Sequence, residues 1–218
     1  MPDWRDSISL FNSRALEYDE WYVKHRDLAR SEEEAVKALG LVGRGIDVGA
    51  GSGFFTRLVG AVALDPSLEM SKIAKSRGLE VALGVGELMP IRDSSIDYVL
   101  IVVTLCFSKD PEGIIRESYR VLKSGGVLAA CIIPLESPWG ELYSRLGREG
   151  HPFYSRANLL TLRWLEGALT RVGFRIEGYV ATLGRGVGEY FEEAKWVNES
   201  EASSYGFVCV KSIKVNAS

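Results

Sequence analysis

The sequence predicts an α/β fold with a doubly wound, mostly parallel sheet, and two observations support this. First, seven apolar segments of strand length follow residue 44, at about 45–48, 61–65, 79–84, 96–103, 126–133, 174–183 and 205–213. Second, helical patterns separate most of them, at about 53–59, 67–77, 111–123 and 157–172. Strands that alternate with helices pair in parallel, because each helix returns the chain across one face of the sheet. The longest apolar runs, 98–107 and 127–135, have the length of central strands covered on both faces.

The composition is that of an ordinary globular protein. The 218 residues are 46% hydrophobic and 25% charged, with a net charge of −3. We predict a single domain over 1–218, with a helical cap at 1–40 and a ligand-binding core at 41–218. No basic stripe indicates a nucleic-acid partner, and the apolar runs are too short to span a bilayer. Because the first residues are charged and resemble no signal peptide, we expect a cytoplasmic protein without a membrane partner.

Three cysteines, Cys106, Cys131 and Cys209, lie far apart along the chain and are odd in number. Two of them fall within apolar runs. This pattern is typical of buried, reduced thiols in a cytoplasmic protein. We therefore expect neither a disulfide framework nor a metal site.

The first forty residues predict two helices between about 4 and 39. Apolar side chains recur there at helical spacing, at Trp4, Ile8, Phe11, Ala15 and Tyr18. Ser31 is the expected N-cap of the last helical stretch. The segment is interpreted either as an amphipathic cap that packs on the domain, or as a lid. In the lid, Tyr18 and a basic residue, Arg26 or Arg30, would contact a ligand.

The last two strand segments differ from the others, because no apolar crossover helix separates them. Phe174–Leu183 and Tyr205–Lys214 are therefore predicted to pair antiparallel and to close the sheet. The insert between them, 184–201, is acidic and aromatic. It is either a solvated amphipathic helix or a wall of a substrate pocket.

The stretch from Gly45 to Thr56 is a short apolar strand that breaks at glycines and re-enters a helix. Glycines let backbone amides approach a ligand closely, and Asp47 supplies an acceptor for an amine or a hydroxyl. The spacing is Asp-x-Gly-x-Gly-x-Gly, and Phe54 stands where a dinucleotide fingerprint has its third glycine. The loop therefore favours an uncharged nucleoside with a zwitterionic tail over an anionic pyrophosphate.

Two further strand ends are expected to border the same crevice, because ligands of doubly wound sheets bind beyond the carboxyl ends of the strands. Asp65 ends the second strand, where its carboxylate can accept hydrogen bonds from both hydroxyls of a ribose. The alternative is that Asp65 only caps the following helix. The small residues Gly84–Gly86 end the third strand, where backbone N–H groups can meet the edge of a purine and Leu88 can lie against its ring.

Five ordered motifs carry a family resemblance. They are Asp47-Val-Gly-Ala-Gly-Ser-Gly53, Leu64-Asp-Pro-Ser67, Gly86-Glu-Leu-Met-Pro90, Ser95-Ile-Asp97 and Val121-Leu-Lys-Ser-Gly-Gly126. Because it carries these motifs in this order, the chain resembles a class I S-adenosylmethionine-dependent methyltransferase of the small-molecule, methyltransferase type 11-like family. The resemblance implies a Rossmann-like, seven-stranded sheet with one antiparallel strand. It also implies S-adenosylmethionine as cofactor, S-adenosylhomocysteine as its product, and a small-molecule methyl acceptor. Because the link from Gly53 to Asp65 is short for this family, the first helix after the loop should be clipped.

The resemblance further implies a set of cofactor-binding residues. They are Tyr18, Arg26, Asp47, Gly49, Ala50, Gly51, Gly53, Phe54, Asp65, Pro66, Met70, Gly86, Glu87, Leu88, Val103 and Thr104. Asp47 and the glycine loop would hold the methionine amino end, and Asp65 would bind the ribose. Residues 86–88 would border the adenine. Residues 103–104 would lie near the methyl group.

The motifs do not identify a catalytic residue, and the reaction need not have one. Transfer of a methyl group from a sulfonium ion is an in-line displacement. It requires attack geometry and exclusion of water more than a strong base. The candidates are His25 and His151, the only histidines of the chain. His25 would belong to the lid with Tyr18 and Arg26, and His151 follows the fifth strand at the ligand-binding end. Cys106 sits where a cytosine-methylating enzyme has its nucleophile, but it lacks the preceding proline.

Two other functions remain as alternatives. A nicotinamide-dependent oxidoreductase would need a pyrophosphate loop, which Phe54 disfavours. A protein that binds S-adenosylmethionine for regulation, without turnover, would keep the same cofactor positions. The acceptor, the methylated atom and the oligomeric state are open at this point.

Overall fold

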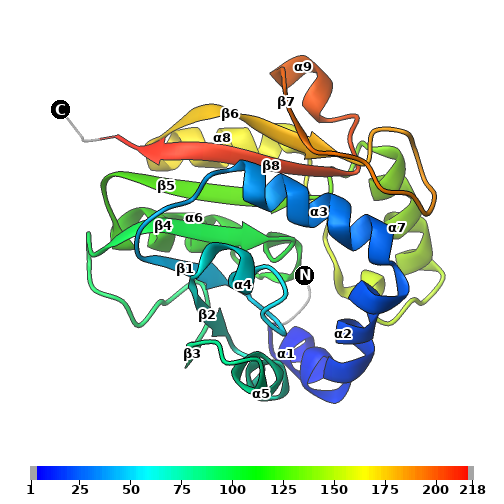
Figure 1. The fold of residues 1–218 in the computed structure, drawn as a ribbon, viewed down its shortest axis with the longest axis horizontal. Coiled ribbons are helices and arrows are strands. Elements are labelled where there is room, and N and C mark those ends of the chain that lie inside the picture. Colours follow the sequence, from blue (N-terminus) through cyan, green and yellow to red (C-terminus); the bar gives the residue numbers. More distant parts are fainter. Residues whose placement is uncertain (1–3, 216–218) are drawn as a thin grey trace.

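The computed structural model describes residues 4–215, which fold around an eight-stranded sheet (Figure 1). The strands are β1 (Gly45–Val48), β2 (Val62–Asp65), β3 (Val81–Leu83), β4 (Ile96–Val102), β5 (Leu122–Ile132), β6 (Phe174–Thr182), β7 (Lys195–Val197) and β8 (Phe207–Lys214). Their order across the sheet is β3-β2-β1-β4-β5-β8-β6-β7. Neighbours among β1 to β5 pair in parallel, whereas β8 runs antiparallel between β5 and β6. The predicted doubly wound sheet with an antiparallel closing pair is confirmed.

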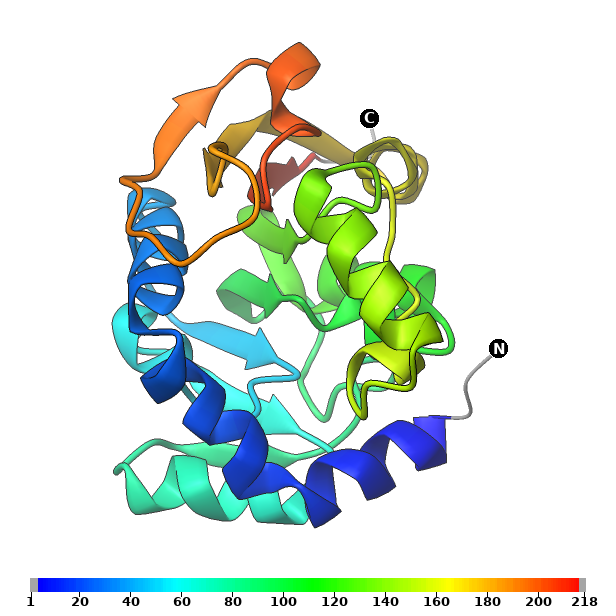
Figure 2. The same ribbon diagram turned by 90° about the vertical axis from the view of Figure 1, so that its right-hand side faces the viewer.

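Helices cover both faces of this sheet. They are α1 (Trp4–Ser13), α2 (Ala15–Lys24), α3 (Arg26–Ala38), α4 (Thr56–Val59), α5 (Leu68–Ser76), α6 (Pro111–Val121), α7 (Pro138–Arg148), α8 (Leu162–Val172) and α9 (Glu199–Ala202). On one face, Ile115 of α6 and Leu165 of α8 join the core. On the other face, Val36 of α3 and Trp139 of α7 do so. Figure 2 looks onto the end of the sheet towards which the parallel strands point, where α1, α2 and α7 lie around the strand ends.

The N-terminal segment forms three helices and not the predicted two. α2 ends and α3 begins at His25, whose backbone leaves the helical region at φ −110° and ψ 53°. Ser31 therefore lies inside α3, and its predicted role as an N-cap is wrong. Its hydroxyl donates to the Asp27 carbonyl at 2.9 Å and accepts from the Glu192 amide at 2.9 Å, which ties the 184–201 insert to α3.

The insert and the segment after β5 also differ from prediction. Instead of an amphipathic helix, the insert contributes the edge strand β7, which pairs antiparallel with β6 and adds an eighth strand to the expected seven. The helix α7 was not predicted, although Ser137 caps it by accepting from the Gly140 amide and Pro138 occupies its first turn. α8 begins after the cap Thr161, later than the predicted residue 157. Gly140 and Gly147 interrupt the helical periodicity of α7, which weakens its signal in the sequence.

The cysteine prediction is wrong for two of the three residues. Cys131 of β5 and Cys209 of β8 form a disulfide, and the antiparallel register places them directly opposite each other. The pairing joins residues that are 78 positions apart. Cys106 is a buried free thiol. The spacing of the cysteines could not reveal the bridge, because it depends on which strands are neighbours in the sheet.

The clipped helix after the glycine loop is confirmed. α4 has only 4 residues and ends at Gly60, whose left-handed backbone (φ 69°) stops the helix. In the described part of the chain, no helix has the length and apolar character needed to cross a membrane.

Candidate active site

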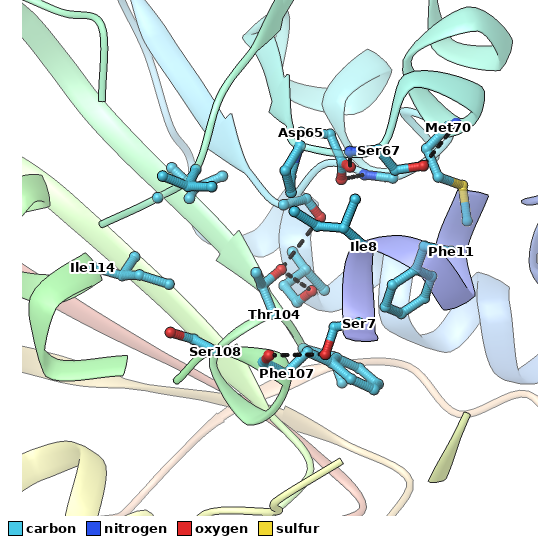
Figure 3. Close-up of a pocket in the computed structure, with 18 of the residues that line it drawn as sticks. Ser7, Ile8, Phe11, Asp65, Ser67, Met70, Thr104, Phe107, Ser108 and Ile114 are labelled. Atoms are coloured by element: carbon cyan, nitrogen blue, oxygen red, sulfur yellow. Dashed lines mark hydrogen bonds between the residues drawn. The ribbon is translucent and has the colours of Figure 1, made fainter. Parts of the chain in front are cut away.

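A cavity of about 780 Å³, here called the loop pocket, lies at the carboxyl ends of β1, β2 and β4 and beneath α1 (Figure 3). Ten of the sixteen residues predicted to bind cofactor line it: Tyr18, Gly49, Gly51, Asp65, Pro66, Met70, Gly86, Glu87, Val103 and Thr104. These residues come from five separate segments of the chain.

The Asp65 carboxylate points at the glycine loop. Its Oδ2 accepts a hydrogen bond from the Gly51 amide at 2.7 Å, and its Oδ1 accepts from the Ser67 amide at 2.8 Å. Burial raises the pKa of the Asp65 carboxyl, and these two hydrogen bonds oppose the rise. A Cβ added to Gly51 would meet nothing closer than the Met70 sulfur at 4.0 Å, so the space beside the loop is open.

At two other positions of the loop pocket, close packing leaves no room for a side chain and so requires glycine. A Cβ on Gly49 would lie 2.2 Å from Thr104 Cγ2, and the residue has a left-handed backbone (φ 70°). A Cβ on Gly86 would lie 2.7 Å from Val48 Cγ1. Beside Gly86, the Glu87 carboxylate accepts a hydrogen bond from the Ser108 hydroxyl at 2.5 Å. The ends of β1, β3 and β4 therefore approach one another only because these positions lack side chains.

Six predicted cofactor residues do not line the loop pocket: Arg26, Asp47, Ala50, Gly53, Phe54 and Leu88. Asp47 is buried behind the loop, where its Oδ2 accepts a hydrogen bond from the Thr56 hydroxyl at 2.6 Å. Burial raises the pKa of Asp47 to about 7, and this hydrogen bond opposes the rise. Phe54 stacks on Tyr22 with ring centroids 3.9 Å apart, and Leu88 is 75% exposed.

Residues of α1 complete the loop pocket, and the sequence interpretation missed them as site residues. Ser7, Ile8 and Phe11 line it, and the Ser7 hydroxyl donates to the Phe107 carbonyl at 3.3 Å (Figure 3). The Asn12 side chain accepts from the Ser67 hydroxyl at 2.8 Å and so joins α1 to the start of α5. The helical spacing of Ile8 and Phe11 was visible, but it did not show what these side chains face.

The segment after β4 separates the loop pocket from a second cavity. Val103 has a left-handed backbone (φ 52°), which is strained for a β-branched residue, and its amide donates to the Cys131 carbonyl at 2.8 Å. The Thr104 hydroxyl donates to the Val102 carbonyl at 3.1 Å. Tyr18, Val102, Val103 and Phe107 line both cavities. The two cavities are therefore neighbours that share a wall beside the end of β4.

The second cavity, here called the aromatic pocket, has a volume of about 960 Å³ and lies between α2, α3 and α7. Its aromatic lining consists of Tyr18, Trp21, Tyr22, Phe55, Phe107, Tyr143, Phe153 and Tyr154. Glu32 of α3 also lines it and is only 6% exposed. The sequence interpretation did not single out Glu32, which lies in a run of three glutamates. One signal was available, because Glu32 is four residues from both Leu28 and Val36 on the buried stripe of α3.

Of the two histidines, only His151 lines the aromatic pocket. It stacks on Tyr154 with ring centroids 4.3 Å apart, and burial lowers its pKa. His25 does not line the pocket but pairs with Glu189 of the insert. Both histidines and Glu189 border a further, shallower cavity. The insert therefore reaches the neighbourhood of the aromatic pocket without lining it.

The chain shows clear similarity to known proteins. Residues 46–130 match the family described as "Methyltransferase domain". The chain is 32% identical to an uncharacterized protein of Methanocaldococcus jannaschii over 213 residues, which cover 95% of this chain and 100% of that protein. It is 34% identical to an uncharacterized protein of Mycobacterium tuberculosis over 220 residues, which cover 97% of this chain and 76% of that protein.

A solved structure from Thermotoga maritima superposes with a TM-score of 0.87 at 32% sequence identity. The match covers 94% of this chain and 98% of that chain, which is described as an S-adenosylmethionine-dependent methyltransferase and possible histamine N-methyltransferase. The likeness thus extends beyond the glycine-loop region to the N-terminal helices and the closing strands. The chain therefore belongs to the class I S-adenosylmethionine-dependent methyltransferases, in the methyltransferase type 11 family.

Proposed function

We propose that this methyltransferase binds S-adenosylmethionine in the loop pocket and transfers its methyl group to a small molecule in the aromatic pocket. The observation that carries the proposal is the position of Asp65. Its carboxylate is held against the Gly51 amide, at the edge of open space beside the glycine loop. The second cavity adjoins this space, with Val103 in the wall of both, so that a donor and an acceptor bound in the two cavities would lie close together.

Asp65 is suited to bind the ribose. A carboxylate offers about four acceptor positions, and the Gly51 and Ser67 amides occupy two of them. The remaining lone pairs can accept from two vicinal hydroxyls. Gly86 and Glu87 line the adjoining wall and would border the adenine. Asp47 lies behind the loop, and we propose that it supports the loop through Thr56.

The bound cofactor would supply a methyl group activated by a positively charged sulfur. The residues of this chain would align the acceptor with that group and exclude water from the reaction. Tyr18, Val103 and Phe107 surround the junction of the two cavities, and their mostly apolar surfaces suit this task. The helices α1 and α2 lie over the strand ends and would shield the bound ligands, as the lid interpretation expects (Figure 2).

Calorimetric titration with S-adenosylhomocysteine tests the proposed cofactor site. Asp65→Ala should weaken binding roughly 100-fold, because it removes two hydrogen bonds to a charged acceptor. The matched control is Asp93→Ala, which removes a carboxylate that pairs with Arg120 and lines neither pocket. Equal affinities in both variants, or no heat with the wild-type protein at millimolar ligand, would contradict the proposal.

Two measurements separate the proposal from its alternatives. A nicotinamide-dependent enzyme would be stabilised by NAD in a thermal-shift experiment, which we do not expect because the Phe54 ring stands where a pyrophosphate loop needs glycine. A binding protein without turnover would bind S-adenosylhomocysteine but transfer no radiolabelled methyl group to any member of a metabolite collection. We expect labelled product from at least one small-molecule fraction.

A further inference from the structure

Glu32 is a buried carboxyl in a pocket built mainly from aromatic rings. Its neighbours Glu33 and Glu34 pair with Arg57 and Lys37 at the surface. Glu32 instead lies on the buried side of α3 and is 6% exposed. Burial of an unpaired carboxylate is strongly unfavourable, so a side chain of this kind usually has a partner.

In the described residues 4–215, the Glu32 carboxyl has no hydrogen-bond or ion-pair partner. Two other charged side chains line the aromatic pocket, and both are engaged elsewhere. Lys24 pairs with Glu20 at 2.8 Å, and Glu17 pairs with Arg14 at 2.7 Å. Burial raises the pKa of Glu32 to about 8. A positively charged ligand in the pocket would restore the negative charge of this carboxyl and complete its hydrogen bonds.

The walls around Glu32 are also suited to a cation. Tyr18 and Tyr22 of α2 and Tyr143 of α7 line the same pocket as the Glu32 carboxyl. The Tyr143 ring stacks on Tyr154 at a centroid distance of 4.2 Å, which fixes the orientation of both. The faces of such rings attract ammonium groups through their quadrupole. An anionic acceptor would meet both a carboxyl and electron-rich rings, and would be repelled.

The aromatic pocket also lies where a methyl acceptor must be. Tyr18, Val103 and Phe107 line it and the loop pocket alike. A ligand anchored by Glu32 can therefore extend towards the cofactor position proposed above. The buried carboxyl, the aromatic walls and the position of the pocket together favour one class of methyl acceptor.

We propose that the methyl acceptor is a protonated amine, which binds in the aromatic pocket with its ammonium group against the Glu32 carboxylate. This carboxylate then accepts a proton from the ammonium group before the methyl group is transferred. The inference rests on the proposed function, because it needs the cofactor in the loop pocket. The ammonium group gives one proton to Glu32 and becomes a neutral amine. Its nitrogen lone pair then forms the new bond to the methyl carbon while the carbon–sulfur bond breaks, and that electron pair stays on sulfur. The product is a methylated ammonium ion, and the proton on Glu32 returns to solvent.

A charge series of probes tests the recognition. We would titrate the protein, saturated with S-adenosylhomocysteine, with 2-phenylethylamine, 2-phenylethanol and 3-phenylpropanoate, and with n-butylamine as a smaller cation. We expect an ammonium probe to bind at least roughly 10-fold more tightly than the neutral and anionic probes, because its hydrogen bond to Glu32 joins two charged groups. Glu32→Gln should abolish this preference. The control Glu34→Gln, at an exposed position of the same helix, should keep it.

Proton release provides a second readout. At pH 7 the empty pocket holds a protonated Glu32, so binding of an ammonium probe should release about one proton, measured by calorimetry in buffers of different ionisation enthalpy. The other titratable groups that line the pocket are Glu17, Tyr18, Tyr22, Lys24, Tyr143, His151 and Tyr154. The tyrosines stay neutral at this pH, and burial lowers the pKa of His151, so neither should contribute. Glu32→Gln should release none.

The outcomes separate the two proposals. If the wild-type protein does not bind S-adenosylhomocysteine, the proposed function itself fails. If it binds S-adenosylhomocysteine but prefers the alcohol or the carboxylate, or binds no ammonium probe at 10 mM, only the amine inference is overturned. The same holds if Glu32→Gln keeps both the preference and the proton release. The affinity of this variant for S-adenosylhomocysteine shows whether it is folded, and the wild-type charge series does not depend on it.

Discussion

The two halves of the sheet, on either side of β4, build their parts of the site in different ways. In the β3-β2-β1 half, the key contacts are local in sequence: Asp65 accepts from Ser67, 2 residues away, and from Gly51, 14 residues away. In the β5-β8-β6 half and the helix α3 that covers it, the contacts join distant segments. The disulfide spans 78 residues, and the hydrogen bond between Glu192 and Ser31 spans 161. The contacts of the first half therefore lie within a short stretch of sequence, whereas those of the second half join segments that only folding brings together.

The largest effect should come from the disulfide of the second half. Replacing Cys131→Ala and Cys209→Ala together should lower the free energy of unfolding by about 4 kcal/mol, because the bridge restricts a long loop in the unfolded chain. Urea unfolding of the double variant measures this. Wild-type protein under reducing conditions separates loss of the bridge from loss of side-chain volume. An unchanged unfolding midpoint in both samples would contradict a structural role for the bridge.

The next effect concerns Glu32 and has a defined pH dependence. Burial raises the pKa of the folded protein's Glu32 to about 8, above the 4.5 of an ordinary glutamate. The unfolded chain therefore ionises first as the pH rises, and stability falls between these two values. Glu32→Gln should remove this loss and stabilise the protein by on the order of 3 kcal/mol at pH 7, with almost no gain at pH 4.5. Urea unfolding at both pH values measures it.

Glu34→Gln serves as the control for that experiment, since the Glu34 side chain is 44% exposed. Its stability should follow the wild-type protein at both pH values. A Glu32→Gln variant that also did so would show that Glu32 has a partner in solution that lets it ionise normally.

A smaller effect tests the first half of the sheet. Gly49→Ala should destabilise the protein by about 2–3 kcal/mol, because it combines a left-handed backbone with a Cβ 2.2 Å from Thr104 Cγ2. Gly60→Ala is the matched control. It has a similar backbone (φ 69°) but no atom within 4 Å of the added Cβ, so only the backbone cost of roughly 1–2 kcal/mol applies. Equal losses in the two variants would mean that the loop can relax away from Thr104.

The smallest effect concerns the lid candidate His25. Its ring pairs with Glu189 at the surface, outside both pockets. His25→Gln should therefore change stability by less than about 0.5 kcal/mol and leave the affinity for S-adenosylhomocysteine within twofold. A large loss of affinity for S-adenosylhomocysteine would contradict this expectation and indicate that His25 contributes to the cofactor site.

Much of the loop pocket could be predicted because its residues lie in short, ordered segments. Asp65, Gly51 and Thr104 stand at strand ends, and parallel strands bring such ends to the same edge of the sheet. Asp47 and Leu88 do not line the loop pocket, because Asp47 lies behind the loop and Leu88 lies in solvent. A motif gives the position of the backbone, but the direction of each side chain depends on the surrounding packing.

The sequence by itself determined the positions of the first four strands, the glycine loop and the short helix α4. All of these depend on backbone geometry that neighbouring residues impose. Only the tertiary structure decided that Cys131 meets Cys209, that α7 faces α2 and α3 across an aromatic cavity, and that Glu32 is left there without a partner. The reason is physical: burial and pairing are properties of surfaces that meet after folding, and no local pattern records which surfaces those will be.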